Sequence, residues 1–117
     1  MTLKDIEENI ECEIIHRGKS FDKTIIVNVS AGDMMSEVLV SDEENRIIVT
    51  ALTTDQVVRT ADIVEAAGIL LINGKQPQNS MRNLAVESDI TLLSTGMSMF
   101  EACIRLGQLL EKYQMNA

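Results

Sequence analysis

The amino-acid sequence predicts an α/β protein, a single-domain layered α/β fold with a largely parallel sheet flanked by helices. Three short, mainly aliphatic runs in the second half of the chain have continuous rather than alternating hydrophobicity, as in parallel strands that are buried on both faces. Each run is followed by a segment whose apolar residues recur with helical spacing. A length of 117 residues suits one hydrophobic core, so we expect residues 1–117 to form one domain.

The second half of the chain has the order of three strand–helix units. The expected strands are the aliphatic runs at residues 46–50, 69–72 and 90–93. Thr53 and Gln56 have the spacing of a capping box at the start of the first helix, and Gly68 stands where that helix would end. Ser98 and Glu101 predict another capping box, at the start of a long final helix. Because such units connect by right-handed crossovers, the three strands should be parallel.

The first 44 residues have a less regular pattern. Thr2 is expected to cap a short helix that carries Leu3, Ile6 and Ile10. The other expected elements are a strand at 11–15, a loop at 16–20, a strand at 24–29 and a short helix at 33–40. No linker or low-complexity segment separates this part from the rest, so we expect it to belong to the same mixed α/β domain.

The composition excludes several classes of function. The chain has 18 acidic and 10 basic side chains and a net charge of −8, so it lacks the basic surplus that binds a phosphate backbone. Two Phe, one Tyr and no Trp offer few platforms for stacking bases. The acidic N-terminus and the short apolar runs are typical neither of a signal peptide nor of a membrane span. We therefore expect a cytoplasmic protein that binds neither nucleic acid nor membranes.

The sequence contains few residues that could bind a metal or a cofactor or carry out catalysis. Cys12 and Cys103 are isolated, and His16 is the one histidine, so we expect reduced thiols, no metal site and no cofactor. The segment Gly18-Lys19-Ser20 lacks the upstream glycine of a phosphate-binding loop. One enzymatic hypothesis stays open, in which Asp33 acts together with His16. We predict that the protein is not an enzyme.

Small polar residues follow each of the three expected parallel strands. Thr53 follows the first strand, Asn73-Gly74 the second, and Ser94-Thr95 the third. In an open parallel sheet these carboxyl ends form the ligand-binding edge, and the helices that start there favour anions. The pattern favours a pocket for a phosphate-bearing or otherwise polar small molecule. The alternative is that these residues serve only as caps and turns.

The final helix carries more apolar surface than one sheet requires. One stripe consists of Met99, Cys103, Leu106, Leu110 and Tyr113, and a second consists of Phe100, Ile104 and Gly107. A helix that packs only on its own sheet needs a single stripe. Two stripes indicate either a helix that is buried on most sides or a second surface that another subunit covers.

Several segments occur in a recognisable order along nearly the whole chain. They are Phe21-Asp22-Lys23, Gly32-Asp33-Met34-Met35-Ser36, the strand entering Thr53, the segment 68–74, and Leu92-Leu93-Ser94-Thr95 before Met99-Phe100-Glu101. This order and spacing resemble the DRTGG domain family over roughly residues 2–110. The eponymous motif survives as Asp22-Lys23-Thr24, and Ile26-Val27-Asn28 stands where Thr-Gly-Gly would lie.

The resemblance implies one DRTGG-like regulatory domain over residues 1–117, similar to the N-terminal domain of HPr kinase/phosphorylase. Such domains are homodimeric or regulatory modules without catalytic activity. Asp33 lies in one of the matched segments. The candidate ligand-binding residues are Asp33, Thr53, Asn73, Gly74, Ser94 and Thr95. We expect a homodimer that senses a small polar or nucleotide-like ligand. The alternative is an adaptor for a larger enzyme, since stand-alone copies are similar to small proteins encoded beside iron-only hydrogenase components.

Overall fold

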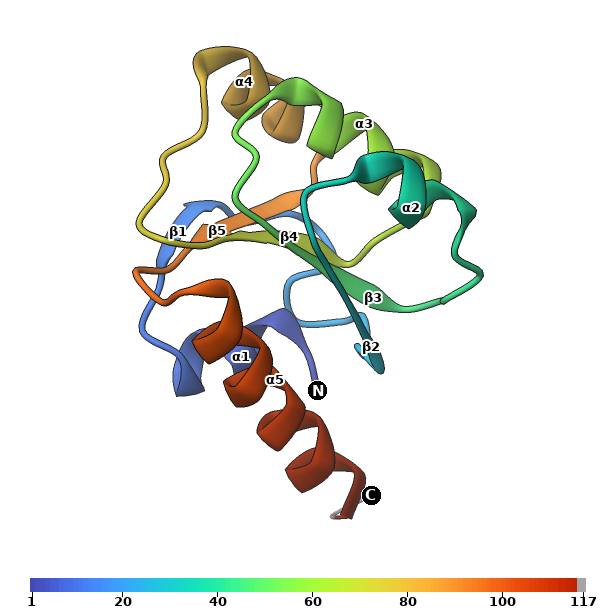
Figure 1. The fold of residues 1–117 in the computed structure, drawn as a ribbon, viewed down its shortest axis with the longest axis vertical. Coiled ribbons are helices and arrows are strands. Elements are labelled where there is room, and N and C mark those ends of the chain that lie inside the picture. The colour runs from blue at the N-terminus through green and yellow to red at the C-terminus, as the bar shows by residue number, and fades with distance from the viewer. Residues whose placement is uncertain (116–117) are drawn as a thin grey trace.

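A five-stranded sheet with the order β1-β5-β4-β3-β2 lies between two layers of helices (Figure 1). The computed structural model describes residues 1–115. The strands are β1 (Glu13–His16), β2 (Asn28–Ala31), β3 (Arg46–Thr50), β4 (Gly68–Leu71) and β5 (Thr91–Ser94). The helices are α1 (Leu3–Asn9), α2 (Met35–Val40), α3 (Asp55–Ile63), α4 (Asn79–Ser88) and α5 (Met99–Met115). Helices α1 and α5 cover one face of the sheet, and α2, α3 and α4 cover the other.

The predicted parallel core is confirmed, and β1 is the exception to it. Strands β2, β3, β4 and β5 pair in parallel, and the register places Ile48 beside Ile69. Strand β1 pairs with β5 in the antiparallel direction, so that Glu13 lies opposite Ser94. A strand near residues 11–15 was expected from the sequence, but its antiparallel place at the edge of the sheet was not.

Strands β3, β4 and β5 are buried on both faces, as their continuous hydrophobicity predicts. Along β3, Ile47 and Val49 pack with α1 and α5, whereas Ile48 packs with the three helices of the other layer. All residues of β3, β4 and β5 are buried. No helix within residues 1–115 is both long and apolar enough to cross a membrane.

Two predicted capping arrangements are confirmed and one is wrong. Thr2 caps α1, and Ser98 and Glu101 exchange the reciprocal hydrogen bonds of a capping box before α5. Thr53 does not cap α3, because the N-cap is Thr54, which makes no side-chain capping bond. The carbonyl of Thr53 instead accepts a hydrogen bond from the backbone N–H of Gln78 at 3.0 Å, which ties the start of α3 to the start of α4.

Gly68 does not end α3, as the sequence suggested, but begins β4. The helix ends at Ile63, and Glu65 adopts the left-handed conformation, with φ 55°, in the turn that follows. Gly68 lies against α1, where an added Cβ would come within 2.9 Å of the Leu3 Cδ1 atom. The glycine is therefore required by close packing between sheet and helix rather than by a turn.

The strand expected at 24–29 is shorter and lies later, as β2. The N–H of Ile26 donates to the Met1 carbonyl at 2.6 Å, and the N–H of Val27 donates to the Asn45 carbonyl at 2.9 Å. These bonds hold the segment between α1 and the start of β3, so ladder pairing with β3 begins only at Asn28. High β-propensity in this segment was outweighed by tertiary hydrogen bonds.

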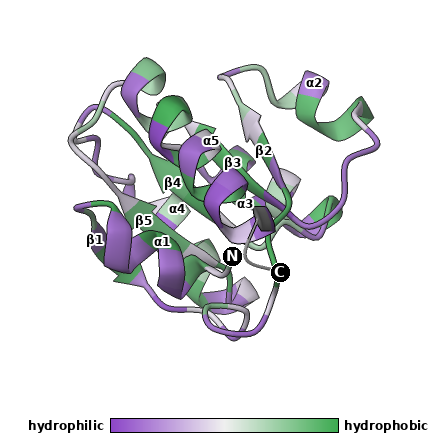
Figure 2. Cartoon of the chain, turned by 90° about the horizontal axis from the view of Figure 1, so that it is seen from below, coloured by the Kyte–Doolittle hydropathy of each residue, from purple (hydrophilic) through white to green (hydrophobic). Residues whose placement is uncertain are grey.

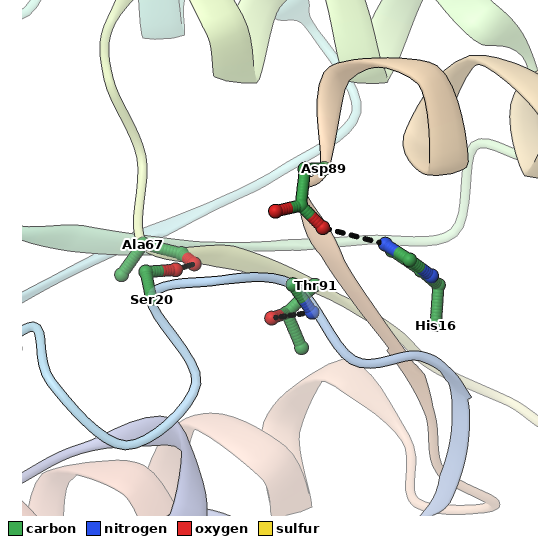
Figure 3. A network of polar contacts seen from close by, with 6 residues as sticks. His16, Ser20, Ala67, Asp89 and Thr91 are labelled. Carbon is green, nitrogen blue, oxygen red and sulfur yellow. Dashed lines mark hydrogen bonds and ion pairs between the residues drawn. The ribbon is translucent and has the colours of Figure 1, made fainter.

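The chain between β1 and residue 20 is anchored at the amino ends of β4 and β5 (Figure 3). His16 Nε2 lies 3.1 Å from Asp89 Oδ1, just before β5. The N–H of Gly18 donates to Thr91 Oγ1 at 2.8 Å, and the Ser20 hydroxyl donates to a carbonyl just before β4. His16 thus belongs to β1 and to this anchor, and not to the loop that the sequence predicted at 16–20.

Helix α5 is not buried on all sides. Ala102 and Leu106 are fully buried against the sheet, but Phe100 and Ile104 expose 74% and 43% of their surfaces. Figure 2 views this layer from outside and shows α1 mostly hydrophilic, whereas α5 mixes hydrophobic with hydrophilic residues. The sequence left two interpretations of the two apolar stripes on this helix open, and the structure excludes the one in which the helix is buried on most sides.

Candidate functional site

A hollow of about 610 Å³ opens at the carboxyl ends of β4 and β5. Three parts of the chain line it: the segment leading into β1, the loop after β4, and the connection from β5 to α5. This is the edge at which open parallel sheets bind ligands. The antiparallel β1 adds a wall that a purely parallel sheet would not have, since it runs toward the amino end of β5 and leaves its own start at the hollow.

The six candidate residues from the sequence fall into two groups. Gly74, Ser94 and Thr95 line the hollow, and Asn73 immediately precedes Gly74. The lining includes neither Asp33 nor Thr53. Half of the expected set therefore converges on one concave surface.

The backbone donors expected at Asn73-Gly74 are already used. The N–H of Asn73 donates to the Met97 carbonyl at 2.8 Å, and the N–H of Gly74 donates to the Thr95 carbonyl at 2.8 Å. Asn73 adopts the left-handed conformation, with φ 57°, that this turn needs. These bonds join the loop after β4 to the loop after β5. The turn therefore shapes the hollow but does not offer these two N–H groups to an anion.

The two hydroxyls in the hollow also have their protons engaged. Ser94 Oγ donates to the Lys75 carbonyl at 2.7 Å, and Thr95 Oγ1 donates to the Glu11 carbonyl at 2.9 Å. Both side chains are buried, which makes these bonds part of the framework. A hydroxyl that donates its proton can still accept, so both oxygens can act toward a ligand only as acceptors, and Thr95 Oγ1 already accepts once, from the Met97 N–H at 3.3 Å.

The amino end of α5 carries its own anion. The Glu101 N–H donates to Ser98 Oγ at 3.2 Å, and Glu101 Oε1 accepts from the Ser98 N–H at 3.3 Å and from Ser98 Oγ at 3.0 Å. The carboxylate thus occupies the position at which an α-helix would attract a phosphate.

Carboxylates give the hollow a negative character. Glu11, Glu13 and Glu101 line it, and its lining contains no Lys or Arg. Two of these carboxylates are partly engaged, that of Glu101 by Ser98 and that of Glu13 by Gln76, whose Nε2 lies 3.4 Å from Glu13 Oε2. Hydroxyl oxygens and carboxylates together make a surface rich in hydrogen-bond acceptors. Such a surface selects ligand groups that donate, such as amino, hydroxyl or ring N–H groups, and repels bare phosphate.

Cys12 lies in the hollow as a protonated thiol. Burial, together with the charge of Glu7, raises the pKa of Cys12 to about 11. The thiolate is the nucleophilic form of cysteine, so a thiol with this pKa is a weak nucleophile near neutral pH. Cys12 therefore serves as a small apolar wall rather than as a reactive group.

Asp33 acts within the fold and lies far from His16. Asp33 Oδ1 accepts hydrogen bonds from Thr50 Oγ1 at 2.8 Å and from the Ala51 N–H at 2.9 Å, at the carboxyl end of β3. His16 pairs with Asp89 at the amino end of β5. The two residues lie at opposite ends of the sheet, so the hypothesis that they act together in catalysis is wrong.

The acidic part of the lining was missed from the sequence. Glu11, Glu13 and Glu101 come from segments that the sequence placed correctly as an early strand and a final helix. Their convergence depends on β1 lying beside β5, with Glu13 opposite Ser94. The surplus of acidic residues in the composition was the one signal that pointed to them.

Comparison with known proteins identifies the fold. No protein-family model and no curated protein matches the sequence. A solved structure of the CBS and DRTGG domains of the regulatory region of Clostridium perfringens pyrophosphatase, complexed with the activator diadenosine tetraphosphate, is similar, with a TM-score of 0.70 and 16% sequence identity. The likeness covers 87% of this chain and 44% of that chain. The protein therefore has a DRTGG-like α/β fold, in agreement with the resemblance of its sequence.

Proposed function

We propose that this DRTGG-like fold serves as a non-catalytic regulatory module, a homodimer that senses a small phosphorylated or nucleotide-like ligand. The observation that carries the proposal is the acceptor-rich hollow at the carboxyl ends of β4 and β5. The similar solved structure comes from a regulatory region bound to a dinucleotide activator, which supports a ligand of this class. Residues 1–117 act as one regulatory domain in this proposal.

The distribution of charge sets how such a ligand would bind. Base amino groups and ribose hydroxyls are donors, and they suit the oxygens of Ser94, Thr95 and the neighbouring carboxylates. The phosphates would lie away from these carboxylates, toward solvent. Lys75, which is exposed in the loop after β4, would supply a positive charge to them.

The apolar flank of α5 supports the homodimer. Phe100 and Ile104 are large, exposed and one turn apart, and Gly107 follows one turn later. A contact between two copies through this flank would remove both side chains from water. The small Gly107 would let the partner approach the helix closely.

A thermal-shift screen tests the ligand proposal. The probes are ATP, adenosine, diadenosine tetraphosphate and inorganic phosphate, each added to the full chain. A ligand present at about one hundred times its Kd stabilises the folded state by about 2.7 kcal/mol, so binding raises Tm by several degrees. We expect adenosine-containing probes to raise Tm and phosphate alone to leave it unchanged, because the donors of the nucleoside fit the hollow.

Matched variants locate the binding. Glu101→Gln and Ser94→Ala change groups in the hollow, whereas Glu8→Gln removes a comparable charge from α1. The shift should fall in the first two variants and persist in the third. Equal shifts in all variants, or no shift with any probe, would contradict the proposal.

Sedimentation of wild type and Phe100→Ser tests the dimer, which should dissociate in the variant.

A second candidate function is that of an adaptor that docks on a larger enzyme, such as an iron-only hydrogenase assembly. Exposed aliphatic side chains on α2 and α3, among them Leu39 and Ile63, favour this candidate. They lie in the helical layer opposite α5, so they can serve a partner independently of the dimer.

A further inference from the structure

A second concave surface lies where the carboxyl ends of α2 and α3 meet the start of β3. This hollow of about 460 Å³ is here called the α2–α3 face, and the residues that characterise it are Leu39, Asp42, Glu43, Glu44, Ile63 and Glu65. It lies at the amino end of β3, opposite the edge of the sheet that holds the ligand hollow. The two surfaces can therefore be occupied at the same time.

Two aliphatic side chains of this face are exposed to water without a function in the fold. Leu39 exposes 43% of its surface and Ile63 exposes 70%. They come from different helices, and both line the same hollow. An apolar side chain that entered the hollow would bury them both, which is a favourable contact of the kind found at the centre of protein interfaces.

The rim of the face is strongly acidic. Four carboxylates line the hollow, those of Asp42, Glu43, Glu44 and Glu65, and all four residues are exposed. Neither α2 nor α3 has a basic residue in its last turn. The negative ends of two helix dipoles therefore add to the field of the side chains.

The positive charge of Arg46 balances only part of this negative charge. It is the one basic residue in the lining, it is 2% exposed, and its guanidinium donates to the Val38 and Ser41 carbonyls at 3.2 Å each. Its Nε is buried and has no hydrogen-bond partner within residues 1–115. One buried cation needs one negative charge to balance it, and the rim supplies four. With four negative charges and one positive, the lining keeps a net charge of −3.

The rim is held in place before any partner arrives. Asn28 Nδ2 donates to the Glu44 carbonyl at 2.7 Å, and the N–H of Val27 donates to the Asn45 carbonyl at 2.9 Å. Asn45 adopts the left-handed conformation, with φ 53°. A preorganised rim costs less entropy on binding than a loop that must first become ordered.

We infer that the α2–α3 face docks a basic segment of a partner protein, whose bulky apolar side chain enters between Leu39 and Ile63 and whose Lys or Arg residues pair with the acidic rim. The inference rests on the adaptor function given above and names where that adaptor binds. A second copy of this chain is a poor occupant, because a two-fold contact would place the two acidic rims against each other.

Peptide selection on the full chain tests the inference. A random peptide library displayed on phage is selected against the wild-type protein, and enriched sequences are made as soluble peptides. We expect them to carry a large aliphatic or aromatic residue flanked by Lys or Arg. Their affinity should fall as salt is raised, because the charges on the rim are exposed. Chemical-shift changes should centre on residues 39–46 and 61–65.

Two pairs of variants separate this face from nonspecific attraction to an acidic protein. Ile63→Ser should weaken peptide binding about tenfold, whereas Val86→Ser, which alters an exposed valine on α4, should not. Glu43→Gln/Glu44→Gln should weaken binding and reduce its salt dependence, whereas Glu8→Gln/Glu111→Gln on the other layer should not. All substituted residues are exposed, so the variants should fold, and circular dichroism checks this.

Several results would overturn the inference. They are a failure to enrich any peptide, enriched peptides without basic residues, equal losses in the test and control variants, or a change in the sedimentation of the protein alone on Ile63→Ser. The last result would assign the face to contact between copies of the chain. The thermal-shift screen with nucleotides reports on the other edge of the sheet, so failure of one proposal leaves the other intact. A partner that still binds Ile63→Ser would support an adaptor with a different docking surface.

Discussion

The hydroxyl of Thr95 donates a hydrogen bond to the backbone carbonyl of Glu11, 84 positions earlier in the chain, at 2.9 Å. Thr95 Oγ1 also accepts from the Met97 N–H at 3.3 Å. One side chain therefore joins the segment before β1 to the connection between β5 and α5. Because both segments line the same hollow, the shape of the candidate site depends on this contact.

Replacing Thr95 with valine should weaken this contact at the hollow beyond β4 and β5. Thr95→Val keeps the shape of the side chain but leaves the Glu11 carbonyl without its donor, so we expect a loss of about 1–3 kcal/mol in the free energy of unfolding. Urea denaturation measures the loss. Thr53→Val is the matched control, because Thr53 lies outside the hollow, and its stability should stay within about 0.5 kcal/mol of wild type. Equal losses in the two variants would show that the contact with Glu11 contributes nothing specific.

Replacing Gly68 with alanine should destabilise the protein through overpacking. The added Cβ would lie 2.9 Å from Leu3 Cδ1 and 3.2 Å from the Thr91 carbonyl oxygen, and the latter belongs to backbone that cannot turn aside. We expect a loss of about 1–3 kcal/mol. Gly107→Ala provides the opposite case, since an added Cβ there has nothing within 4 Å and the residue lies inside a helix. In a Phe100→Ser background, which removes the proposed dimer contact, that change should raise stability by roughly 0.5–1 kcal/mol.

Alkylation of Cys12 should be slow in the folded protein. With its pKa raised from an ordinary 9.0 to about 11, the thiolate at pH 8 is about one hundredfold rarer than in an unperturbed cysteine. In a Cys103→Ser background, iodoacetamide should react about one hundredfold more slowly with the native protein than with the same protein in urea, and the native rate should keep rising up to pH 11. A native rate close to the rate in urea would refute this protonation state.

The contribution of Asp5 to stability should depend on pH. Burial acts to raise the pKa of Asp5, but hydrogen bonds from the backbone N–H and the hydroxyl of Thr2 outweigh it, and the net pKa is lowered from 3.8. A lowered pKa in the folded state means that the stabilisation is present above pH 3.8 and is lost as the pH falls through the folded value.

The test compares wild type with Asp5→Asn in urea across this range of pH. Because the carboxylate is only partly buried, the difference at pH 7 should be only about 0.5 kcal/mol, and it should shrink toward zero below pH 3.8. Glu8→Gln, on the same helix but outside the capping box, should show no such dependence. A difference that stays constant with pH would mean that the Asp5 charge is not what stabilises α1.

The parallel core was predictable from the sequence because its signal is local. The centres of β3, β4 and β5, at residues 47–49, 69–71 and 92–93, are continuously aliphatic, which is typical of strands covered on both faces. The box formed by Ser98 and Glu101 was predictable for the same reason, since both partners lie within one turn. By contrast, the capping box predicted from Thr53 and Gln56 is wrong, because the Thr53 carbonyl accepts a hydrogen bond from a distant donor, the N–H of Gln78.

The candidate site was only half predictable because it depends on long-range placement. Gly74, Ser94 and Thr95 follow from the rule that ligands bind beyond the carboxyl ends of strands. Their hydrogen-bonding roles do not follow from it, since the N–H of Gly74 and both hydroxyls are engaged by partners in other segments. The acidic wall appears only once β1 is placed against β5. The sequence predicted a site that favours anions, whereas the hollow favours hydrogen-bond donors. This difference arises from contacts between distant segments, which the sequence pattern does not reveal.

The pairing of β1 with β5 also fixes an order of events when the chain is made. Glu13 and Ser94 face each other across the ladder, so β1 has no partner on a growing polypeptide until β5 has been synthesised. Strands β3, β4 and β5 follow one another in the chain and can assemble through short connections. Contacts between distant residues form slowly, since the entropy of closing a long loop must be overcome first. Strand β1 must therefore stay unpaired until β5 has been made, and the wall that it adds to the hollow cannot form before then.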